Sequence, residues 1–262
     1  MKDESSDIRP PAAIVLAAFG TASEEGRTVF DYILARARRR YPRHRVLLAF
    51  TSRTVVDGLK GRGIDCLHLS DVPAQLTFLG YRQAAFQPLL ILPGLQDDTI
   101  RRMPMDDLQT ACGLPLLSGP DDLDAVLAAL TAEIIPGQQT VFVLHGSTHS
   151  PEMEKAWFDL TEALERRFPG SVACMIEGDG PEKFNRLGEQ NRVHFVPMTL
   201  TAGKHMEKDV LGDDFDSWKN RIGASRVTCA PPLGCNSAIL DIFFRHLDQA
   251  LASLILREAK QE

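Results

Sequence analysis

Short apolar runs alternate along the chain with longer segments in which apolar residues recur every three to four positions. The first run, Ala12–Phe19, stops at Gly20, and Glu24–Arg40 then carries apolar residues on one face and arginines on the other. A short apolar run bounded by a turn residue is typical of a buried strand, and a period of 3.6 is typical of an amphipathic helix. This part of the chain therefore predicts a strand, a turn and a helix.

The same two patterns predict further elements toward the C-terminus. Strands are expected at residues 45–51, 66–69, 84–92, 114–117, 140–144, 172–176, 193–198 and 227–230. Helices are expected at residues 55–63, 72–80, 121–135, 152–168, 181–187, 205–210, 214–222 and 238–256. Asp71, which directly precedes one of these helices, is predicted to be its N-cap.

The alternation of strands and helices in both halves predicts an α/β fold in which parallel sheets carry helices on both faces. Both halves also open alike, with AAFGTAS at Ala17–Ser23 and VLHGSTH at Val143–His149. Because 262 residues suit two domains, we expect two similar lobes, residues 1–128 and 129–262, with the closing helix able to pack back on the first. Ligands bind beyond the carboxyl ends of such strands, so the expected site is a cleft between the lobes.

Three ionisable side chains lie at or shortly beyond the ends of predicted strands in the second half. His145 follows TVFVL, Glu177 follows VACMI, and His205 follows VPMTLTAGK. Two imidazoles and a carboxylate are a ligand set suited to Zn, Fe, Co or Ni with coordination positions left open. Each residue taken singly is more often a capping or solvated group, so the predicted metal site depends on the position that all three share.

Other polar side chains near predicted strand ends are candidate substrate contacts. Arg53 follows the second predicted strand and could clamp a carboxylate through its guanidinium group, or pair with a nearby aspartate on the surface. Lys204, beside His205, could do the same or be solvated. His149, four residues after His145, is interpreted as a cap or rim residue first and as an auxiliary substrate or metal contact second.

The turn at Gly20 and Thr21 precedes a helix and offers backbone N–H groups to an anion. It lacks GxGxxG, and GxxxxGK[ST] occurs nowhere in the chain. The sequence therefore gives no support for a nucleotide cofactor. Ser147 does not lie in GxSxG, which weakens a hydrolase interpretation.

Composition narrows the class of protein further. The formal net charge of -6 argues against nucleic acid as a partner. Five cysteines without a CxxC pair indicate neither a zinc ribbon nor a dithiol redox site, and they are interpreted as reduced core residues. No stretch reads as a signal peptide or a membrane span, so we expect a cytoplasmic protein without a membrane partner.

Several stretches are similar to one known family: LAAFGTASEEG, FDYILARARRRYP, AFTSR, DVPAQLTFLGY, VFVLHGSTH, VPMTLTAGKH and GDDFDSWKNR. With these stretches the chain resembles the anaerobic-pathway sirohydrochlorin cobaltochelatases of cobalamin biosynthesis, which belong with the ferrochelatases to the class II chelatase superfamily. The resemblance implies two Rossmann-like lobes around a cleft that holds the macrocycle. It also implies metal-binding roles for His145, Glu177 and His205.

The activity that the resemblance implies is insertion of Co²⁺, or alternatively Fe²⁺ or Ni²⁺, into sirohydrochlorin, with the metal as a substrate and no nucleotide. The three ligands would hold the metal, and one His or Glu177 would take up the pyrrole protons. The turn at Gly20, Arg53 and Lys204 would position the peripheral carboxylates. The chain departs from the family at residues 94–98, GLQDD, where a Gly-Glu-Glu-Tyr-like segment is usual. This departure bears on metal delivery and on the choice of metal.

Three alternatives stay open. The protein could bind a tetrapyrrole or a metal without catalysis, or it could metallate another porphyrin or use another ion. A receptor of the periplasmic-binding-protein type also has two lobes and a cleft, but it requires a signal sequence. A homo-oligomer is compatible with the sequence.

Overall fold

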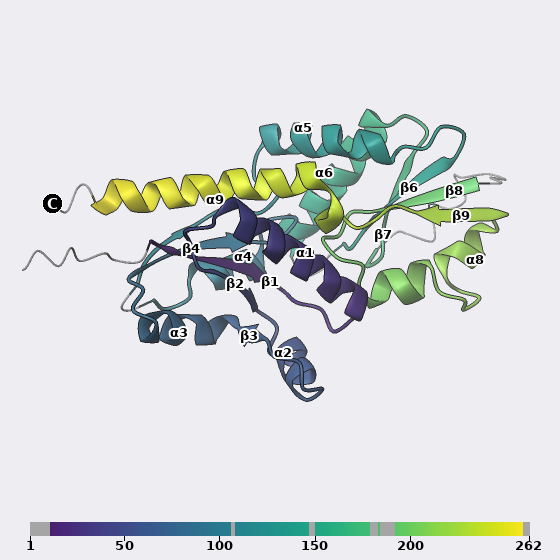
Figure 1. Ribbon diagram of the computed structural model, residues 1–262. Helices are drawn as coiled ribbons and strands as arrows, with labels where there is room; N and C mark the ends of the chain where they lie inside the picture. The colour runs from purple at the N-terminus through teal and green to yellow at the C-terminus, as the bar shows by residue number, and fades with distance from the viewer. Residues whose placement is uncertain (1–10, 106–107, 147–149, 179–182, 184–191, 259–262) are drawn as a thin grey trace, which may run out of the picture. The chain divides into compact units, whose positions relative to one another are not determined.

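The computed structural model describes residues 11–105, 108–146, 150–178, 183 and 192–258 (Figure 1). The chain divides into two compact units, the first comprising Met1–Gly20, Leu34–Pro115 and Phe243–Glu262, and the second Thr21–Ile33 and Leu116–Ile242. Helices α1 (Glu24–Arg40) and α9 (Ser237–Glu258) each contribute residues to both units. The lobe boundary at residues 128 and 129 stays a prediction.

The first unit contains a five-stranded parallel sheet with the order β3-β2-β1-β4-β5. Its strands are β1 (Ala13–Ala18), β2 (Val46–Phe50), β3 (Leu67–His68), β4 (Gln83–Pro88) and β5 (Gln109–Cys112). The helices between them are α2 (Arg53–Lys60), α3 (Val72–Phe78) and α4 (Leu95–Arg101), with the 3₁₀ turn η1 (Leu69–Asp71) before α3. Every residue of β1 is buried, as expected for a central parallel strand covered on both faces.

The second unit contains a four-stranded parallel sheet with the order β7-β6-β8-β9. Its strands are β6 (Gln139–Leu144), β7 (Val172–Met175), β8 (Arg192–Pro197) and β9 (Arg226–Cys229). The helices are α5 (Pro120–Ala129), α6 (Pro151–Arg167) and α8 (Trp218–Ile222), with 3₁₀ turns η2 (Leu130–Glu133) and η5 (Leu233–Cys235) and the π-helical turn η4 (Met206–Val210). Two parallel sheets flanked by helices confirm the predicted fold class.

Each sheet has a point where the chain reverses the direction in which it adds strands. In the second unit β7 lies on one side of β6 and β8 lies on the other, so the reversal falls between β6 and β8. Open α/β sheets bind ligands beyond the carboxyl ends of the strands at such a point. The topology therefore predicts a ligand site among the residues that follow β6, β7 and β8.

Most predicted elements agree with the structure, but the fifth strand was placed wrongly. The polar segment Gln109–Cys112 pairs with β4, whereas the apolar segment 114–117 lies outside the sheet. Leu116 is fully buried without belonging to a strand, which explains the misleading pattern. Helix α4 was not predicted. The helix predicted at 181–187 lies almost wholly outside the described residues.

Two predicted local features need correction. Asp71 stands at the N-cap of α3 but makes no side-chain hydrogen bond there, because it is already the last residue of a 3₁₀ turn. All five cysteines are in the thiol form, yet only Cys174 is buried, and Cys235 is exposed. The interpretation of the cysteines as core residues therefore holds fully for Cys174 alone. Within the described part of the chain, no helix is long and apolar enough to cross a bilayer.

His194 in β8 is a buried imidazole whose charge state matters for stability. Its Nδ1 lies 2.8 Å from Thr228 Oγ1, and that hydroxyl donates to Gln138 Oε1 at 3.0 Å. Nδ1 must therefore carry the proton, and the buried Nε2 has no hydrogen-bond partner among the described residues. Burial lowers the pKa of His194 below its ordinary value because it disfavours the charged ring.

We expect the free energy of unfolding to decrease as the pH falls below about 6.5, the pKa of histidine in an unfolded chain. Below that pH the unfolded chain takes up a proton that folded His194 resists, so the stabilisation is complete above it and is lost on acidification. Denaturant titrations between roughly pH 5 and 8 measure this dependence. The variant His194→Gln should show a shallower dependence, and an unchanged slope would contradict this assignment.

Candidate metal site

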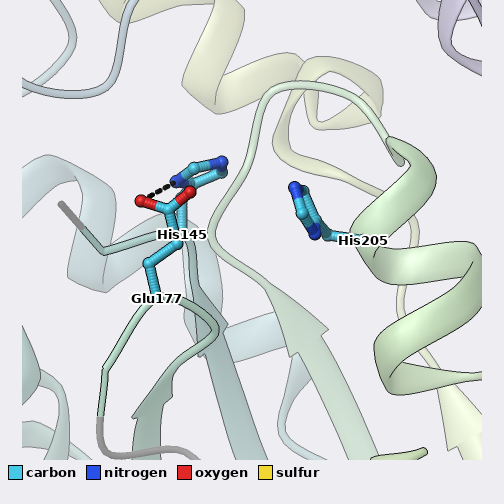
Figure 2. A group of neighbouring side chains, drawn as sticks. All are labelled: His145, Glu177 and His205. Carbon is cyan, nitrogen blue, oxygen red and sulfur yellow. Dashed lines mark ion pairs between the residues drawn. The ribbon is translucent and has the colours of Figure 1, made fainter.

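Three side chains from the second unit converge at the strand reversal (Figure 2). His145 directly follows β6, Glu177 lies just beyond β7, and His205 directly precedes η4 on the chain that leaves β8. One potential ligand atom from each residue lies within 4.8 Å of the others. The structure thus brings together the three residues that the sequence singled out.

The distances within this cluster suit one metal ion after a small adjustment. The ring of His145 lies beside the Glu177 carboxylate, with its Nδ1 3.9 Å from Oε2, and the rings of His145 and His205 are 5.5 Å apart between centroids and nearly perpendicular. Two ligands bonded to one metal at about 2.1 Å lie at most about 4.2 Å apart. The cluster needs to contract by less than about 1 Å to meet this limit, and its partly exposed side chains have room to rotate.

The backbone fixes Glu177 beside His145. Beyond the ends of the strands, the ladder between β6 and β7 continues, because the N–H of Ile176 donates to Leu144 O at 2.9 Å and the N–H of Glu177 donates to His145 O at 2.8 Å. These bonds hold two of the three candidate ligands in register, whatever their side chains do.

Gly146 makes this close approach possible. Its φ is +81°, in the region that favours glycine. A Cβ at this position would lie 2.7 Å from Glu177 O and 3.2 Å from Met175 Cβ. The glycine of the predicted strand-to-helix turn is therefore a packing requirement of the site.

His205 is held by the turn that follows it. Met206 and Val210 are buried in the core of the second unit together with Val143 of β6 and Phe195 of β8. Asp209 is half-exposed, and its Oδ2 lies 2.6 Å from His205 Nδ1. The sequence interpretation missed Asp209, although its position four residues after a histidine in a predicted helix was an available signal.

The segment before His205 is anchored to two other parts of the second unit. The hydroxyl of Ser23 donates to Ala202 O at 3.3 Å, and the N–H of Gly234 donates to Leu200 O at 2.9 Å. Gly234 leaves no room for a larger residue, because a Cβ would lie 2.5 Å from Leu200 O. These contacts define the path of the chain from β8 to His205.

The other candidate side chains, those of Lys204, Arg53 and His149, are exposed or lie outside the described residues. Lys204 is exposed beside His205. Arg53 is exposed at the start of α2 and donates to Ser70 Oγ at 3.0 Å, and that hydroxyl donates to Asp71 at 3.1 Å. His149 lies outside the described residues.

Gly20 and Thr21 have clear structural roles. Gly20 has a φ of +101°, and a Cβ there would lie 2.9 Å from the Phe50 ring. Thr21 is only 8% exposed, and its Oγ1 accepts the N–H of Ser23 at 3.2 Å. Ser23 in turn accepts the N–H of Gly26 at 3.0 Å, which caps α1. Anion binding by this turn stays a prediction.

The segment that departs from the expected family pattern starts helix α4. Gln96 accepts a hydrogen bond from Thr51 Oγ1 at 2.6 Å. Asp97 is buried, and its Oδ2 lies 2.8 Å from Nε of Arg101. Another nitrogen of the same guanidinium group, Nη2, donates to Gly113 O. The carboxylate of Asp97 therefore has a structural partner in the first unit.

The thiols of two half-buried cysteines are poor candidates for metal ligands. Burial raises the pKa of both Cys112 and Cys229 to about 11. A thiol binds a metal as the thiolate, which is scarce near neutral pH at such a pKa. The two imidazoles and the carboxylate of Glu177 are the only cluster of three or more metal-binding side chains among the described residues.

Comparison with known proteins identifies the family of this chain. The sequence profile of a family described as cobalt chelatase (CbiK) matches residues 12–252. Sirohydrochlorin cobaltochelatase CbiKC of Nitratidesulfovibrio vulgaris is 30% identical over 259 residues, which cover 92% of this chain and 91% of that protein. The sirohydrochlorin cobaltochelatase of Salmonella typhimurium is 33% identical over 261 residues, which cover 91% and 96%.

Solved structures share the fold at lower identity. SirB from Bacillus subtilis with Fe³⁺ matches with a TM-score of 0.64 at 15% identity, over 92% of this chain and 96% of that one. CbiX, the terminal enzyme for biosynthesis of siroheme in denitrifying bacteria, matches with a TM-score of 0.57 at 16% identity, over 91% and 99%. The resemblance found in the sequence is confirmed, and the chain belongs to the cobalt chelatase family of enzymes.

Proposed function

We propose that this protein inserts Co²⁺ into sirohydrochlorin and that His145, Glu177 and His205 hold the metal as it enters the macrocycle. The observation that carries the proposal is the convergence of these three side chains at the strand reversal in a member of the cobalt chelatase family. The names of the two curated relatives supply the macrocycle.

The donor set suits a metal that must be released again. Three protein ligands leave positions open for water and then for a pyrrole nitrogen, whereas a fourth would make the site a closed, structural one. Imidazole and carboxylate also bind Fe²⁺ and Ni²⁺, and affinities follow the Irving–Williams order whichever metal is physiological. We propose Co²⁺ as the substrate metal on the family assignment, with Fe²⁺ and Ni²⁺ as the alternatives.

Metal insertion also releases two pyrrole protons, and Glu177 is our candidate to accept them one at a time and to pass each to solvent, to which its side chain is partly exposed. The Nδ1 atoms of both histidines face oxygen acceptors, Gly146 O for His145 and Asp209 for His205. Each ring therefore has one nitrogen left, which the metal would occupy. A carboxylate has two oxygens, so Glu177 could bind the metal through one and accept a proton through the other.

For the peripheral carboxylates of the macrocycle we propose contacts from Arg53, Lys204 and His149 and from the backbone at Gly20 and Thr21. The exposure of Arg53 and Lys204 supports such a role, because both cations are accessible to a ligand. We also propose that the reaction uses no nucleotide, because the phosphate-loop pattern GxxxxGK[ST] does not occur in the chain. We further propose a cytoplasmic protein without nucleic-acid or membrane partners, and a homo-oligomer stays a prediction.

The experiment is anaerobic incubation of the purified protein with sirohydrochlorin and Co²⁺, Fe²⁺ or Ni²⁺ in turn, followed by visible absorption. We expect loss of the free-base bands with Co²⁺ at a rate well above the protein-free control. A shifted spectrum without metallation above that control would indicate a binding protein and would contradict the proposed activity.

Replacing Glu177 with Gln separates metal binding from proton uptake. The amide keeps the size and one ligand oxygen but is a very weak base, so we expect kcat to fall by about 100-fold. The KM for Co²⁺ should rise by a smaller factor than kcat falls, because the amide oxygen and both histidines remain. Steady-state kinetics at several Co²⁺ concentrations make the distinction, and an unchanged kcat would assign proton uptake to another group.

A further inference from the structure

We propose that Asp209 is a positioning residue that sets the tautomer and orientation of His205, so that Nε2 of this ring is the atom presented to the metal. This inference rests on the proposed function, in which His205 is a metal ligand. Asp209 touches neither the metal nor the macrocycle in this account, and its effect passes through the imidazole.

A short hydrogen bond joins Asp209 to His205. Asp209 Oδ2 lies 2.6 Å from His205 Nδ1, a short distance typical of a charge-assisted bond. An ionised carboxylate can only accept, so the proton must be on Nδ1. In the neutral ring the lone pair is then on Nε2.

The turn that carries His205 and Asp209 leaves the two residues little freedom to separate. The N–H of Leu211 donates to Met206 O at 3.0 Å, which closes the wide turn of a π-helix. Met206 and Val210 are 2% and 0% exposed. Because each directly follows one member of the pair in sequence, their burial fixes the backbone from which His205 and Asp209 project toward solvent.

The end of this turn is also tight. A Cβ at Gly212 would clash with Lys208 O, so the chain can pass there only as glycine. The segment that carries Asp209 is therefore anchored by the buried side chains of Met206 and Val210 and ends in a tight turn at Gly212. A residue held this firmly on a ligand ring is suited to orient it.

The physical consequence is a defined metal-binding state before the metal arrives. A free neutral imidazole exchanges its proton between Nδ1 and Nε2, and only the bare nitrogen can bind a metal. An outer carboxylate that fixes the tautomer and orientation of a histidine ligand commonly contributes about 10- to 100-fold to metal affinity. His145 has a backbone counterpart, because its Nδ1 lies 3.0 Å from Gly146 O.

The tautomer can be measured without metal by ¹⁵N–¹H correlation spectra of the histidine side chains in the full-length protein, at a pH where the rings are neutral. We expect the wild-type His205 ring to carry its proton on Nδ1. Asp209→Ala should shift the proton toward Nε2, while Asp209→Asn, which keeps an acceptor oxygen, should retain the wild-type pattern. A His205 ring that stays protonated on Nδ1 in Asp209→Ala would overturn the inference.

The functional consequence is measured by titrating the apo-protein with Co²⁺ and recording the d–d absorption bands. Asp209→Ala should weaken Co²⁺ binding by about 10- to 100-fold, and Asp209→Asn should recover most of the loss. Glu207→Ala removes the same charge from the same exposed turn and should bind Co²⁺ within about twofold of wild type. Thermal unfolding of each variant reports whether the fold is intact.

The outcomes separate this inference from the proposed function. If His205→Ala loses Co²⁺ affinity while Asp209→Ala keeps it, the positioning role is wrong and the metal site stands. If His205→Ala binds Co²⁺ as tightly as wild type, the assignment of His205 as a ligand fails, and the role of Asp209 fails with it.

Discussion

Alanine at His145 or at His205 is expected to reduce Co²⁺ insertion into sirohydrochlorin by at least about 100-fold. In metal sites, loss of the hydrogen-bond partner of a ligand already reduces metal affinity or activity by about 10- to 100-fold. Loss of a ligand itself should reduce them at least as much. The double variant should be little worse than either single one, because two remaining groups no longer form a site and residues that act as a unit are not additive.

The matched control is His44→Ala, which removes an imidazole in the first unit. Its Nδ1 lies 2.7 Å from Ala12 O, so it has a structural partner of its own. We expect wild-type metallation from this variant at temperatures where it is folded. Wild-type insertion rates from both His145→Ala and His205→Ala would show that the cluster is not where the metal is handled.

Alanine at Gly146 is expected to damage the site without removing any of its chemical groups. A methyl group there would lie 2.7 Å from Glu177 O, and the backbone φ of +81° disfavours any residue with a Cβ. The strain alone costs about 1–2 kcal/mol. Relieving the contact requires the turn to move away from Glu177, which would separate the ligand atoms, and we expect at least a tenfold loss of metallation.

Gly137 provides a control with the same strain and no clash. Its φ is +76°, and a Cβ there meets nothing within 4 Å. Gly137→Ala should therefore lose stability by a similar amount, about 1–2 kcal/mol, and keep its metallation rate. Thermal or denaturant unfolding and the metallation assay, performed on both variants, separate strain from displacement of Glu177. Equal loss of activity in the two variants would rule out a specific role for the Gly146 contact.

Long elements with a clear period were predictable from the sequence. Helix α1 begins at Glu24 and ends at Arg40 as expected, because its apolar stripe and its charged ends agree. The three candidate ligands were also predictable, since each follows an apolar run. Their position depends on strand order, and the parallel pairing of β6 with β7 and β8 is what brings the strand ends together.

The features that the sequence did not reveal depend on contacts between distant residues. β5 has no long apolar run, and it becomes a strand by pairing with β4. The apolar residues after it lie outside the sheet, where Leu116 is buried. Helix α4 is short, and its buried Asp97 is paired with Arg101 one turn later. The role of Gly146 depends on how closely the Glu177 carbonyl approaches, which no local pattern reports.

The most direct test of the account is the position of cobalt itself. Anomalous diffraction at the cobalt edge from crystals grown with Co²⁺ locates the ion independently of any assumption about catalysis. The account predicts one strong peak bonded, at about 2.0–2.2 Å, to a nitrogen of His145, an oxygen of Glu177 and Nε2 of His205. A fully occupied cobalt elsewhere in the protein, with these three side chains unliganded, would contradict it.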